Sequence, residues 1–148
     1  MKEIKIFNEN NKPEHQEKKE IIDFLYQHLE NFGDSKEDIE KCLNYALKET
    51  QSFGGFILQS MESGEINSIL VINKTGMNGY IPENILVYIA THKDFRGKGI
   101  GKMMVNKAIE TAEGDIALHV EPDNPAKFLY EKIGFTNKYL EMRYIRKK

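Results

Sequence analysis

The sequence predicts an α/β (α+β) fold, in which about four helices pack on one mixed, mostly antiparallel sheet of about seven strands. Apolar residues alternate with polar ones in some stretches and recur every three or four positions in others, which indicates strands and helices respectively. Three strand-like stretches follow one another between residues 53 and 91 without a helix between them, which favours an antiparallel meander. The chain of 148 residues is expected to form a single domain over 1–148.

The first third of the chain predicts one strand and two helices. Ile4 and Ile6 alternate with charged residues, as in a half-buried strand. Apolar residues at helical spacing predict a helix over 13–33. A second helix is expected to begin at Ser35, because Ser35 and Asp38 resemble a capping box.

The middle of the chain predicts a hairpin and a central strand. Phe53–Met61 and Ile66–Lys74 are expected to be strands joined by a tight turn, and 75–83, rich in glycine and asparagine, a loop. Ile85–Thr91 is apolar on both faces, which is typical of a strand inside a sheet.

The last third completes the predicted order β-α-α-β-β-β-α-β-α-β-β. A helix is expected over 99–112, a strand over 116–120, and a short helix between Pro125 and Gly134. Alternating residues then predict two closing strands, over 135–138 and 140–146.

The segment Arg96-Gly97-Lys98-Gly99-Ile100-Gly101-Lys102 joins the central strand to the next helix. The first amides of a helix lack intrahelical partners, and glycines let the backbone approach a ligand closely. Three cationic side chains add to the positive end of the helix dipole. The segment is therefore predicted to bind phosphate.

Spacing separates the families of phosphate-binding loop. A P-loop needs glycine at position 96 and a hydroxyl at position 103, where this chain has Arg96 and Met103. A dinucleotide fingerprint needs glycine at position 102, where Lys102 stands. The pattern formed by Arg96, Gly99 and Gly101 instead resembles the pyrophosphate loop of the GNAT family of N-acetyltransferases.

A second motif strengthens this resemblance. In that family the next strand is followed by an asparagine, a short helix with a tyrosine, and Gly-Phe. The chain has these residues in the same order, as Asn124, Leu129-Tyr130-Glu131 and Gly134-Phe135. The resemblance covers about residues 84–146 and implies transfer of an acetyl group from acetyl-CoA directly to an amine, without an acyl-enzyme, so that Cys42 needs no catalytic role.

The resemblance also implies roles for individual residues. The strands around 85–91 and 116–120 would separate and admit the pantetheine arm between them, with an amide near Ala90 polarising the thioester. Tyr130 would bind the departing thiolate. The implied acetyl-CoA contacts are Ile89, Ala90, Thr91, Arg96, Gly97, Lys98, Gly99, Ile100, Gly101, Lys102, Asn124 and Tyr130, and Asn124 also suits a helix cap.

The proton acceptor for the amine is not evident. Many members of the family carry Glu or His on the strand before the loop, but Ile85 and Val87 are apolar, and alternation places Tyr88 on the opposite face. Glu83 is the preferred candidate for a base, with Glu121 and His119 as further ones. An acceptor with an intrinsically low pKa, such as an α-amino group, would need the least help.

Composition limits the classes of partner. The net charge is −2, with 21 basic against 23 acidic residues, so no broad basic surface for nucleic acid or a membrane is expected. Four histidines and one cysteine show no metal-ligand spacing, and no apolar stretch is long enough to span a membrane. We expect a cytoplasmic protein that binds acetyl-CoA and an amine acceptor and holds no metal. The resemblance leaves the oligomeric state open, although homodimers are common in the family.

Two other functions remain open from the sequence, namely a non-enzymatic acyl-CoA-binding module and a nucleotide-binding interaction domain. The acceptor pocket is expected between the two early helices and loop 75–83. Acidic residues around the turn between these helices either attract a cationic amine or form a solvated face, the latter being favoured: Glu30, Asp34, Glu37, Asp38 and Glu40.

Overall fold

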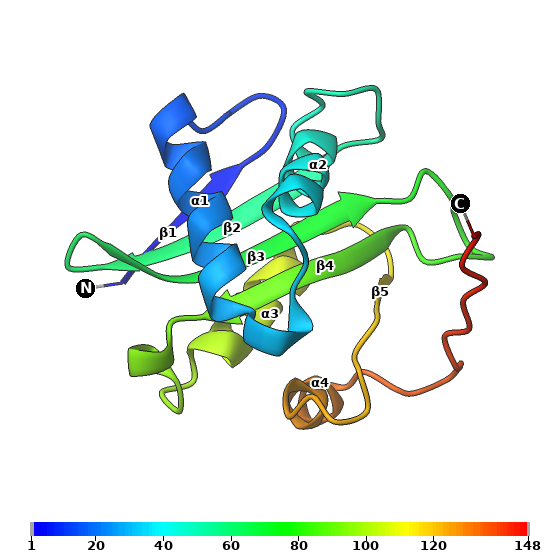
Figure 1. Ribbon diagram of the computed structural model, residues 1–148. Coiled ribbons are helices and arrows are strands. Elements are labelled where there is room, and N and C mark those ends of the chain that lie inside the picture. Colours follow the sequence, from blue (N-terminus) through cyan, green and yellow to red (C-terminus); the bar gives the residue numbers. More distant parts are fainter. Residues whose placement is uncertain (1, 148) are drawn as a thin grey trace.

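The computed structural model describes residues 2–147 and contains one sheet with the strand order β1-β2-β3-β4-β5 (Figure 1). Neighbouring strands are antiparallel from β1 to β4, whereas β5 is parallel to β4. The strands are β1 (Lys2–Phe7), β2 (Gly55–Glu62), β3 (Glu65–Lys74), β4 (Asn84–Thr91) and β5 (Ile116–Leu118). The mixed, mostly antiparallel sheet predicted from the sequence is confirmed.

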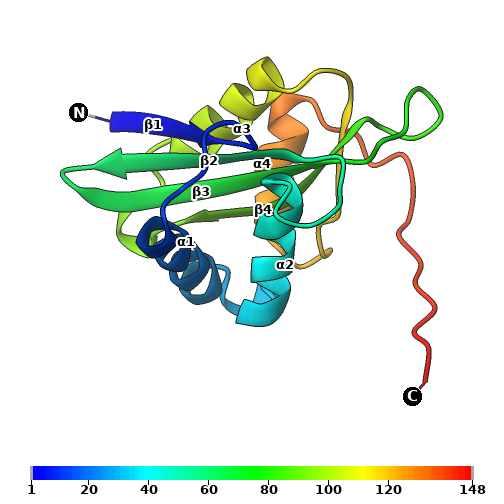
Figure 2. The same ribbon diagram turned by 90° about the horizontal axis from the view of Figure 1, so that it is seen from above.

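Helices cover both faces of the sheet. Figure 2 shows α1 (His15–His28) and α2 (Lys36–Ala46) on one face, and α3 (Ile100–Thr111) and α4 (Ala126–Ile133) on the other. Two single turns of 3-10 helix, Glu30–Phe32 and Lys93–Phe95, follow α1 and β4. Among the helices of residues 2–147, none has the length and apolar character needed to cross a bilayer.

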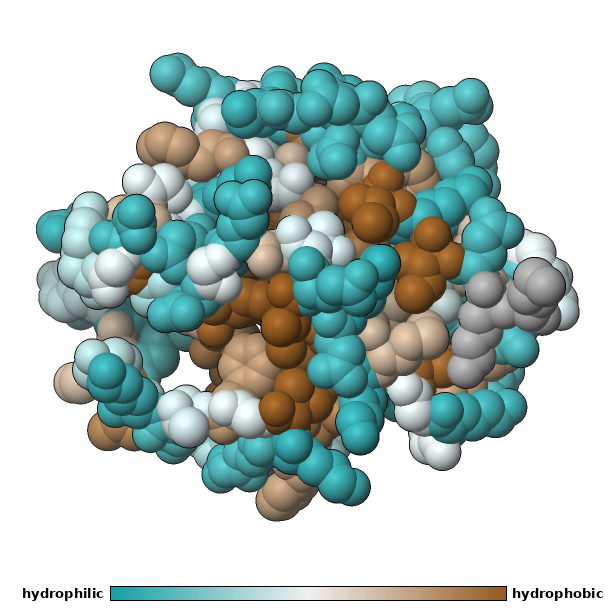
Figure 3. Space-filling view, turned by 180° about the vertical axis from the view of Figure 1, so that it is seen from behind, coloured by the Kyte–Doolittle hydropathy of each residue, from teal (hydrophilic) through white to brown (hydrophobic). Residues whose placement is uncertain are grey.

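Each face of the sheet has its own apolar core. On one face, buried residues of α1 and α2 such as Leu25 and Leu43 pack against Val71 of β3. On the other face, Met104 of α3 and Tyr130 of α4 belong to the second cluster. Figure 3, a view from the side of α3, shows apolar residues grouped around a hollow and hydrophilic residues over much of the remaining surface.

The first helix is shorter than the sequence predicts. α1 ends at His28, and Glu30 has a φ of 53°, a left-handed conformation that breaks the helical path before Gly33. The second helix begins as predicted, because the Ser35 hydroxyl accepts a hydrogen bond of 3.2 Å from the amide of Asp38.

The two closing strands predicted over 135–138 and 140–146 are wrong, so the sheet has five strands rather than about seven. The segment after α4 is extended but unpaired, and it leaves the sheet (Figure 2). Alternation defines the two faces of a strand but provides no partner for its backbone groups. β5 pairs over only three residues, which is a short edge on which to add strands.

Candidate active site

A β-bulge at Val87 interrupts the central strand. On one side of the bulge Tyr88 lies opposite Val71, and on the other Leu86 lies opposite Ile72, so Val87 is the extra residue of β4. The pairing of β4 with β5 also ends here, at Leu86 and Leu118. Among the described residues, no strand pairs with residues 87–91 of β4 on the β5 side, so the separation of the two strands implied by the family resemblance is present.

The register decides which main-chain groups point into the gap between β4 and β5. The amide of His92 donates a hydrogen bond of 2.8 Å to Asn67, and in an antiparallel pair every second residue makes such bonds. Ala90 is therefore bonded to β3, whereas the N–H and C=O groups of Ile89 and Thr91 point toward the gap. The polarising amide expected near Ala90 would then be that of Ile89 or Thr91.

The bulge also changes which side chains share a face. Ile85 lies opposite Asn73, whose amide contacts Cys42 of α2, and Tyr88 lies opposite Val71 in the core under α1 and α2. Ile85 and Tyr88 thus occupy the same face of the sheet. The expectation that alternation separates Tyr88 from Ile85 is wrong, because the extra residue reverses the alternation.

The loop between β4 and α3 exposes a row of backbone donors. Gly97 and Gly99 have φ values of 78° and 80°, and a Cβ at either position would meet no atom within 4 Å. None of the N–H groups from Gly97 to Lys102 donates a hydrogen bond to another of the described residues. These amides lie at the positive end of α3, which begins at Ile100 without a side-chain cap.

A cleft of about 410 Å³ brings the two predicted motifs together. The end of β4 and the phosphate-binding loop form one wall, α4 forms another, and the turn after α1 forms a third. Eleven of the twelve predicted acetyl-CoA contacts line it: Ile89, Ala90, Thr91, Arg96, Gly97, Gly99, Ile100, Gly101, Lys102, Asn124 and Tyr130. Lys98 does not line the cleft, and its ammonium lies 5.4 Å from the centre of the Phe95 ring.

Arg96 binds protein groups on both sides of the cleft. Its Nε donates to the carbonyl of Thr91 over 3.1 Å, and one Nη donates to the carbonyl of His28 over 3.2 Å. The other Nη lies 3.4 Å from a carboxylate oxygen of Glu30. Arg96 therefore links the end of β4 to the turn after α1, while the adjacent free amides face the cleft.

Tyr130 is the buried phenol of the cleft. Burial raises the pKa of Tyr130 to about 12, so the hydroxyl remains protonated at neutral pH. Its ring packs edge-on against Phe135 at 5.8 Å between centroids, which fixes its position on α4. The hydroxyl donates to none of the described residues and is available to a ligand.

Asn124 combines the two roles that suit its position. Its side-chain oxygen accepts a hydrogen bond of 2.9 Å from the amide of Ala126, the first residue of α4. The same residue lines the cleft. A contact with a ligand can be made by the side-chain nitrogen while the oxygen stays on the helix.

Glu83 lies outside the cleft. One of its carboxylate oxygens accepts a 2.7 Å hydrogen bond from the amide of Asp115, and the other a 3.0 Å bond from the amide of Gly79. These backbone donors lower the pKa of Glu83, which makes its carboxylate a weaker base. Glu121 and His119 are exposed and do not line the cleft either.

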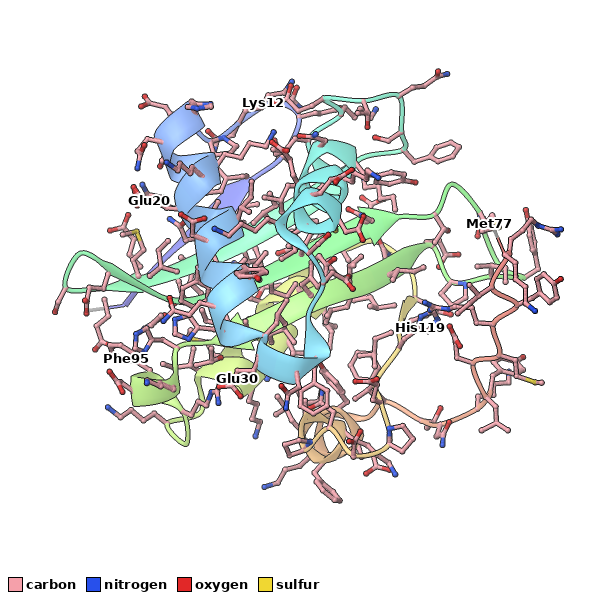
Figure 4. All side chains as sticks on the ribbon, viewed as in Figure 1. Lys12, Glu20, Glu30, Met77, Phe95 and His119 are labelled. Atoms are coloured by element: carbon pink, nitrogen blue, oxygen red, sulfur yellow. The ribbon has the colours of Figure 1, made fainter. Side chains whose placement is uncertain are left out.

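The turn after α1 supplies residues that the motifs did not indicate. His28, Glu30 and Phe32 line the cleft opposite the phosphate-binding loop. Figure 4 shows Glu30 at this turn, just above α4, while His119 lies apart on the segment after β5. In the sequence, this part of the cleft is marked only by the acidic residues of the turn and by the apolar stripe of α1. Neither feature indicates a ligand or a partner residue.

The residues present fit coenzyme A. Six consecutive free amides at a helix N-terminus suit a pyrophosphate. The main-chain groups of Ile89 and the amide of Thr91, which the register directs toward the gap, suit the amides of a pantetheine arm, as a strand edge does; the Thr91 carbonyl is bonded to Arg96. The open space beside Gly97 and Gly99 allows a close approach.

Comparison with known proteins identifies the family. Residues 18–135 match the profile of the acetyltransferase (GNAT) family. The chain belongs to this family. As a member of this family, it is an acetyltransferase. The motifs around Arg96 and Tyr130 lie within the matched region.

Two proteins are similar in sequence to part of this chain. The Cysteine-rich protein 2-binding proteins of Mus musculus and Homo sapiens are 38% identical over 60 residues, which make up 39% of this chain and 8% of theirs. The match thus spans less than a tenth of the length of these relatives.

Two solved structures share the fold over nearly the whole chain. A transcriptional regulator from Bacillus halodurans has a TM-score of 0.70 at 17% identity, covering 97% of this chain and 100% of its own. AAC(6')-Iy in complex with a bisubstrate analogue, CoA-S-monomethyl-acetylneamine, has a TM-score of 0.69 at 13% identity, covering 100% and 99%.

Two further groups take no part in the cleft. Burial raises the pKa of the Cys42 thiol to about 12, which suppresses the nucleophilic thiolate. Within residues 2–147, no three His, Cys, Asp or Glu side chains lie close enough to hold a metal ion together.

Proposed function

We propose that this GNAT protein transfers the acetyl group of acetyl-CoA directly to an amine in the cleft between β4, α4 and the turn after α1. One observation carries the proposal: the gap beyond Leu86, the free amides of Gly97–Lys102 and the Tyr130 hydroxyl all border one cleft. Acetyl-CoA, when bound, supplies an activated acetyl group as a thioester.

Backbone groups hold and polarise this substrate. The amides from Gly97 to Lys102 bind the pyrophosphate, with Lys102 adding a positive charge. The main-chain groups of Ile89 and the amide of Thr91 bind the pantetheine arm along the open edge of β4. One of these two amides donates to the carbonyl oxygen on which negative charge develops.

Tyr130 stabilises the departing sulfur by a hydrogen bond rather than by giving up its proton. With the pKa of Tyr130 near 12, complete transfer to a thiolate of ordinary pKa ~8.5 would be unfavourable by about 5 kcal/mol. A donor that keeps its proton still stabilises the negative charge as it forms.

The acceptor is a weakly basic amine such as an α-amino group. A lysine-like amine of pKa ~10.4 costs about 4 to 5 kcal/mol to deprotonate at pH 7, whereas an α-amino group of pKa ~8 costs much less. On β4, Ile85 and Val87 offer no carboxylate, and Glu83 is bound to two backbone amides. An amine that is partly neutral in solution suits such a site.

Family membership disfavours the alternative of a non-enzymatic acyl-CoA-binding module. Tyr130 lines the cleft, and its buried hydroxyl has no hydrogen-bond partner among the described residues. Such a donor can stabilise a leaving group, a role that cofactor binding alone does not require. A homodimer and a cytoplasmic location remain expectations from the sequence.

The test is turnover with a panel of amines. Purified protein is mixed with acetyl-CoA and peptides that carry either a free α-amine or only a lysine amine, and the released thiol and the acetylated product are measured. Turnover that favours α-amines supports the proposal. Tight binding of acetyl-CoA without turnover on any amine would instead identify a binding module.

A further inference from the structure

Tyr88 and Asp34 form a hydrogen-bonded pair next to residues that line the cleft, although neither lines it. The Tyr88 hydroxyl donates to a carboxylate oxygen of Asp34 over 2.5 Å. Tyr88 is buried in the core under α1 and α2, with 6% of its surface exposed, whereas Asp34 is exposed in the turn between these helices. A residue of the central strand thus holds a surface carboxylate in one position.

The pair lies beside the point where β4 and β5 separate. Tyr88 directly follows the bulge at Val87 and directly precedes Ile89, whose main chain faces the gap. Phe32, two residues before Asp34, lines the cleft. Asp34 is therefore near the cleft, on the face that α1 and α2 cover, although it is not part of the cofactor-binding wall.

Among the described residues, one carboxylate oxygen of Asp34 accepts no side-chain hydrogen bond. Burial and the neighbouring carboxylate both raise the pKa of Tyr88, so its hydroxyl is the donor and occupies one oxygen of Asp34. Within residues 2–147, Asp34 makes no ion pair, whereas Glu30 pairs with Arg96, and Glu37 and Asp38 both pair with Lys41. In the described part of the chain, Asp34 and Glu40 are the acids around this turn that make no ion pair, and of these two Asp34 is oriented by a buried donor.

We propose that Asp34, positioned by Tyr88, binds the positively charged acceptor amine and brings it to the open edge of β4. This inference rests on the proposed acetyl transfer and names the acceptor class more closely: a primary amine that arrives as an ammonium ion. An oriented carboxylate accepts a charge-assisted hydrogen bond from such a group. The carboxylate acts as an anchor, and the proton lost before attack leaves to the surrounding water.

The experiment compares a charged with an uncharged nucleophile. The kcat/KM of Asp34→Asn is measured at neutral pH with a peptide α-amine or alkyl amine, which is largely protonated, and with hydroxylamine, which is largely neutral. We expect a loss of about 10- to 100-fold for the charged amine, mainly through KM, from the loss of one charge-assisted hydrogen bond. Activity on hydroxylamine and the Kd of acetyl-CoA should stay within threefold.

Glu37→Gln is the matched control. It removes one negative charge from the exposed first turn of α2, three residues from Asp34, but the Tyr88 hydroxyl is bonded to Asp34, whereas Glu37 pairs with Lys41. Its kcat/KM for charged amines should change less than threefold. An equal loss in Glu37→Gln would assign the effect to the general field of the acidic turn and overturn the role of Asp34.

Tyr88→Phe tests the positioning role, because it keeps the ring in the core and removes only the hydroxyl. Its KM for charged amines should rise, whereas the same change in an Asp34→Asn background should add little, since Tyr88 acts through Asp34. Additive effects would indicate that Tyr88 serves stability only, and would overturn the positioning role.

The outcomes separate this inference from the function on which it rests. Equal losses on charged and neutral nucleophiles in Asp34→Asn, or no loss at all, would overturn the anchor while acetyl transfer by the unmodified protein stands. Absence of turnover by the unmodified protein on every nucleophile would overturn the proposed function and the inference with it.

Discussion

Arg96 and His28 join the two walls of the cleft: the guanidinium of Arg96, on the phosphate-binding loop, donates a 3.2 Å hydrogen bond to the carbonyl of His28 at the end of α1. The carbonyls at a helix C-terminus lack intrahelical donors and carry the negative end of the dipole, so a cation satisfies them well. The same guanidinium also reaches Thr91 and Glu30. Arg96 thereby links the loop that we propose to bind pyrophosphate to the turn after α1, which we propose to bind the acceptor.

Replacement of Arg96 should therefore weaken both substrates. Arg96→Lys keeps the positive charge but cannot donate to Thr91, His28 and Glu30 together. We expect a loss of about 1 to 2 kcal/mol in the free energy of unfolding, together with a higher Kd for CoA and a higher KM for the amine. Denaturant titration, calorimetry and steady-state kinetics measure these three quantities, and a change confined to CoA binding would contradict the link.

Gly101→Asp should abolish CoA binding while the fold persists. A carboxylate at the start of α3 opposes the pyrophosphate charge, but it also favours the positive end of the helix, so thermal stability should not fall markedly. A Cβ at this position would lie 3.1 Å from the end of the Leu129 side chain, which can move slightly.

Gly101→Ala is the control for that substitution, because it adds the Cβ without the charge. Calorimetry should show a loss of CoA affinity that is at least tenfold greater for Asp than for Ala. Equal affinities in the two folded variants would show that the loop does not bind the pyrophosphate.

Tyr130→Phe should lower kcat on the order of 10²-fold while the Kd of acetyl-CoA changes less than threefold. The hydrogen bond from the hydroxyl to the sulfur strengthens as negative charge develops on the sulfur. Removal of the hydroxyl leaves the ring packed against Phe135. Pre-steady-state release of the thiol measures the chemical step. A kcat within threefold of the original would make Tyr130 a packing residue.

Glu83→Gln should affect stability rather than catalysis. Its pKa is lowered in the folded state from 4.5, so its carboxylate stabilises the fold above the unfolded pKa, and this contribution is lost as the pH falls through the folded value. The variant should therefore have a lower Tm than the original at neutral pH and the same Tm at acid pH, once the carboxyl is protonated in both states.

The kinetics of Glu83→Gln test the proposed acceptor as well. With an α-amine, kcat/KM should level off near pH 8 in both proteins, because the titrating group is the amine itself. A steep loss of activity in Glu83→Gln with CoA binding preserved would show that Glu83 is the base despite its position.

The segment after α4 should mediate self-association. Leu140, Met142 and Tyr144 are 84%, 90% and 81% exposed, an unusual display of large apolar side chains on an extended segment. Light scattering after size-exclusion chromatography should show a concentration-dependent dimer, which Met142→Lys weakens. Asn106→Lys on exposed α3 adds the same charge elsewhere and should not affect it. A strictly monomeric original protein would refute this prediction.

Much of the fold was predictable because its causes are local. The apolar stripe of α2 and its cap at Ser35 act within a few residues, and so does the glycine pattern that leaves the amides of Gly97–Lys102 free. The motif around Tyr130 is equally local, and the cleft brings it to the phosphate-binding loop as the family resemblance implied.

Tertiary structure decided the features that depend on partners distant in the chain. The bulge at Val87 arises from the register between β3 and β4, and it moves Tyr88 to the face where it meets Asp34, 54 residues away. The carboxylate of Glu83 accepts hydrogen bonds from the amides of Gly79 and Asp115, and the fold brings Asp115 to it from 32 residues away. The sequence by itself determined which segments become helices, strands and a phosphate-binding loop, since propensity and capping act over one or two turns. Whether 135–146 finds a strand partner, and which acidic side chains are paired, depends on contacts between distant segments, which only the folded arrangement defines.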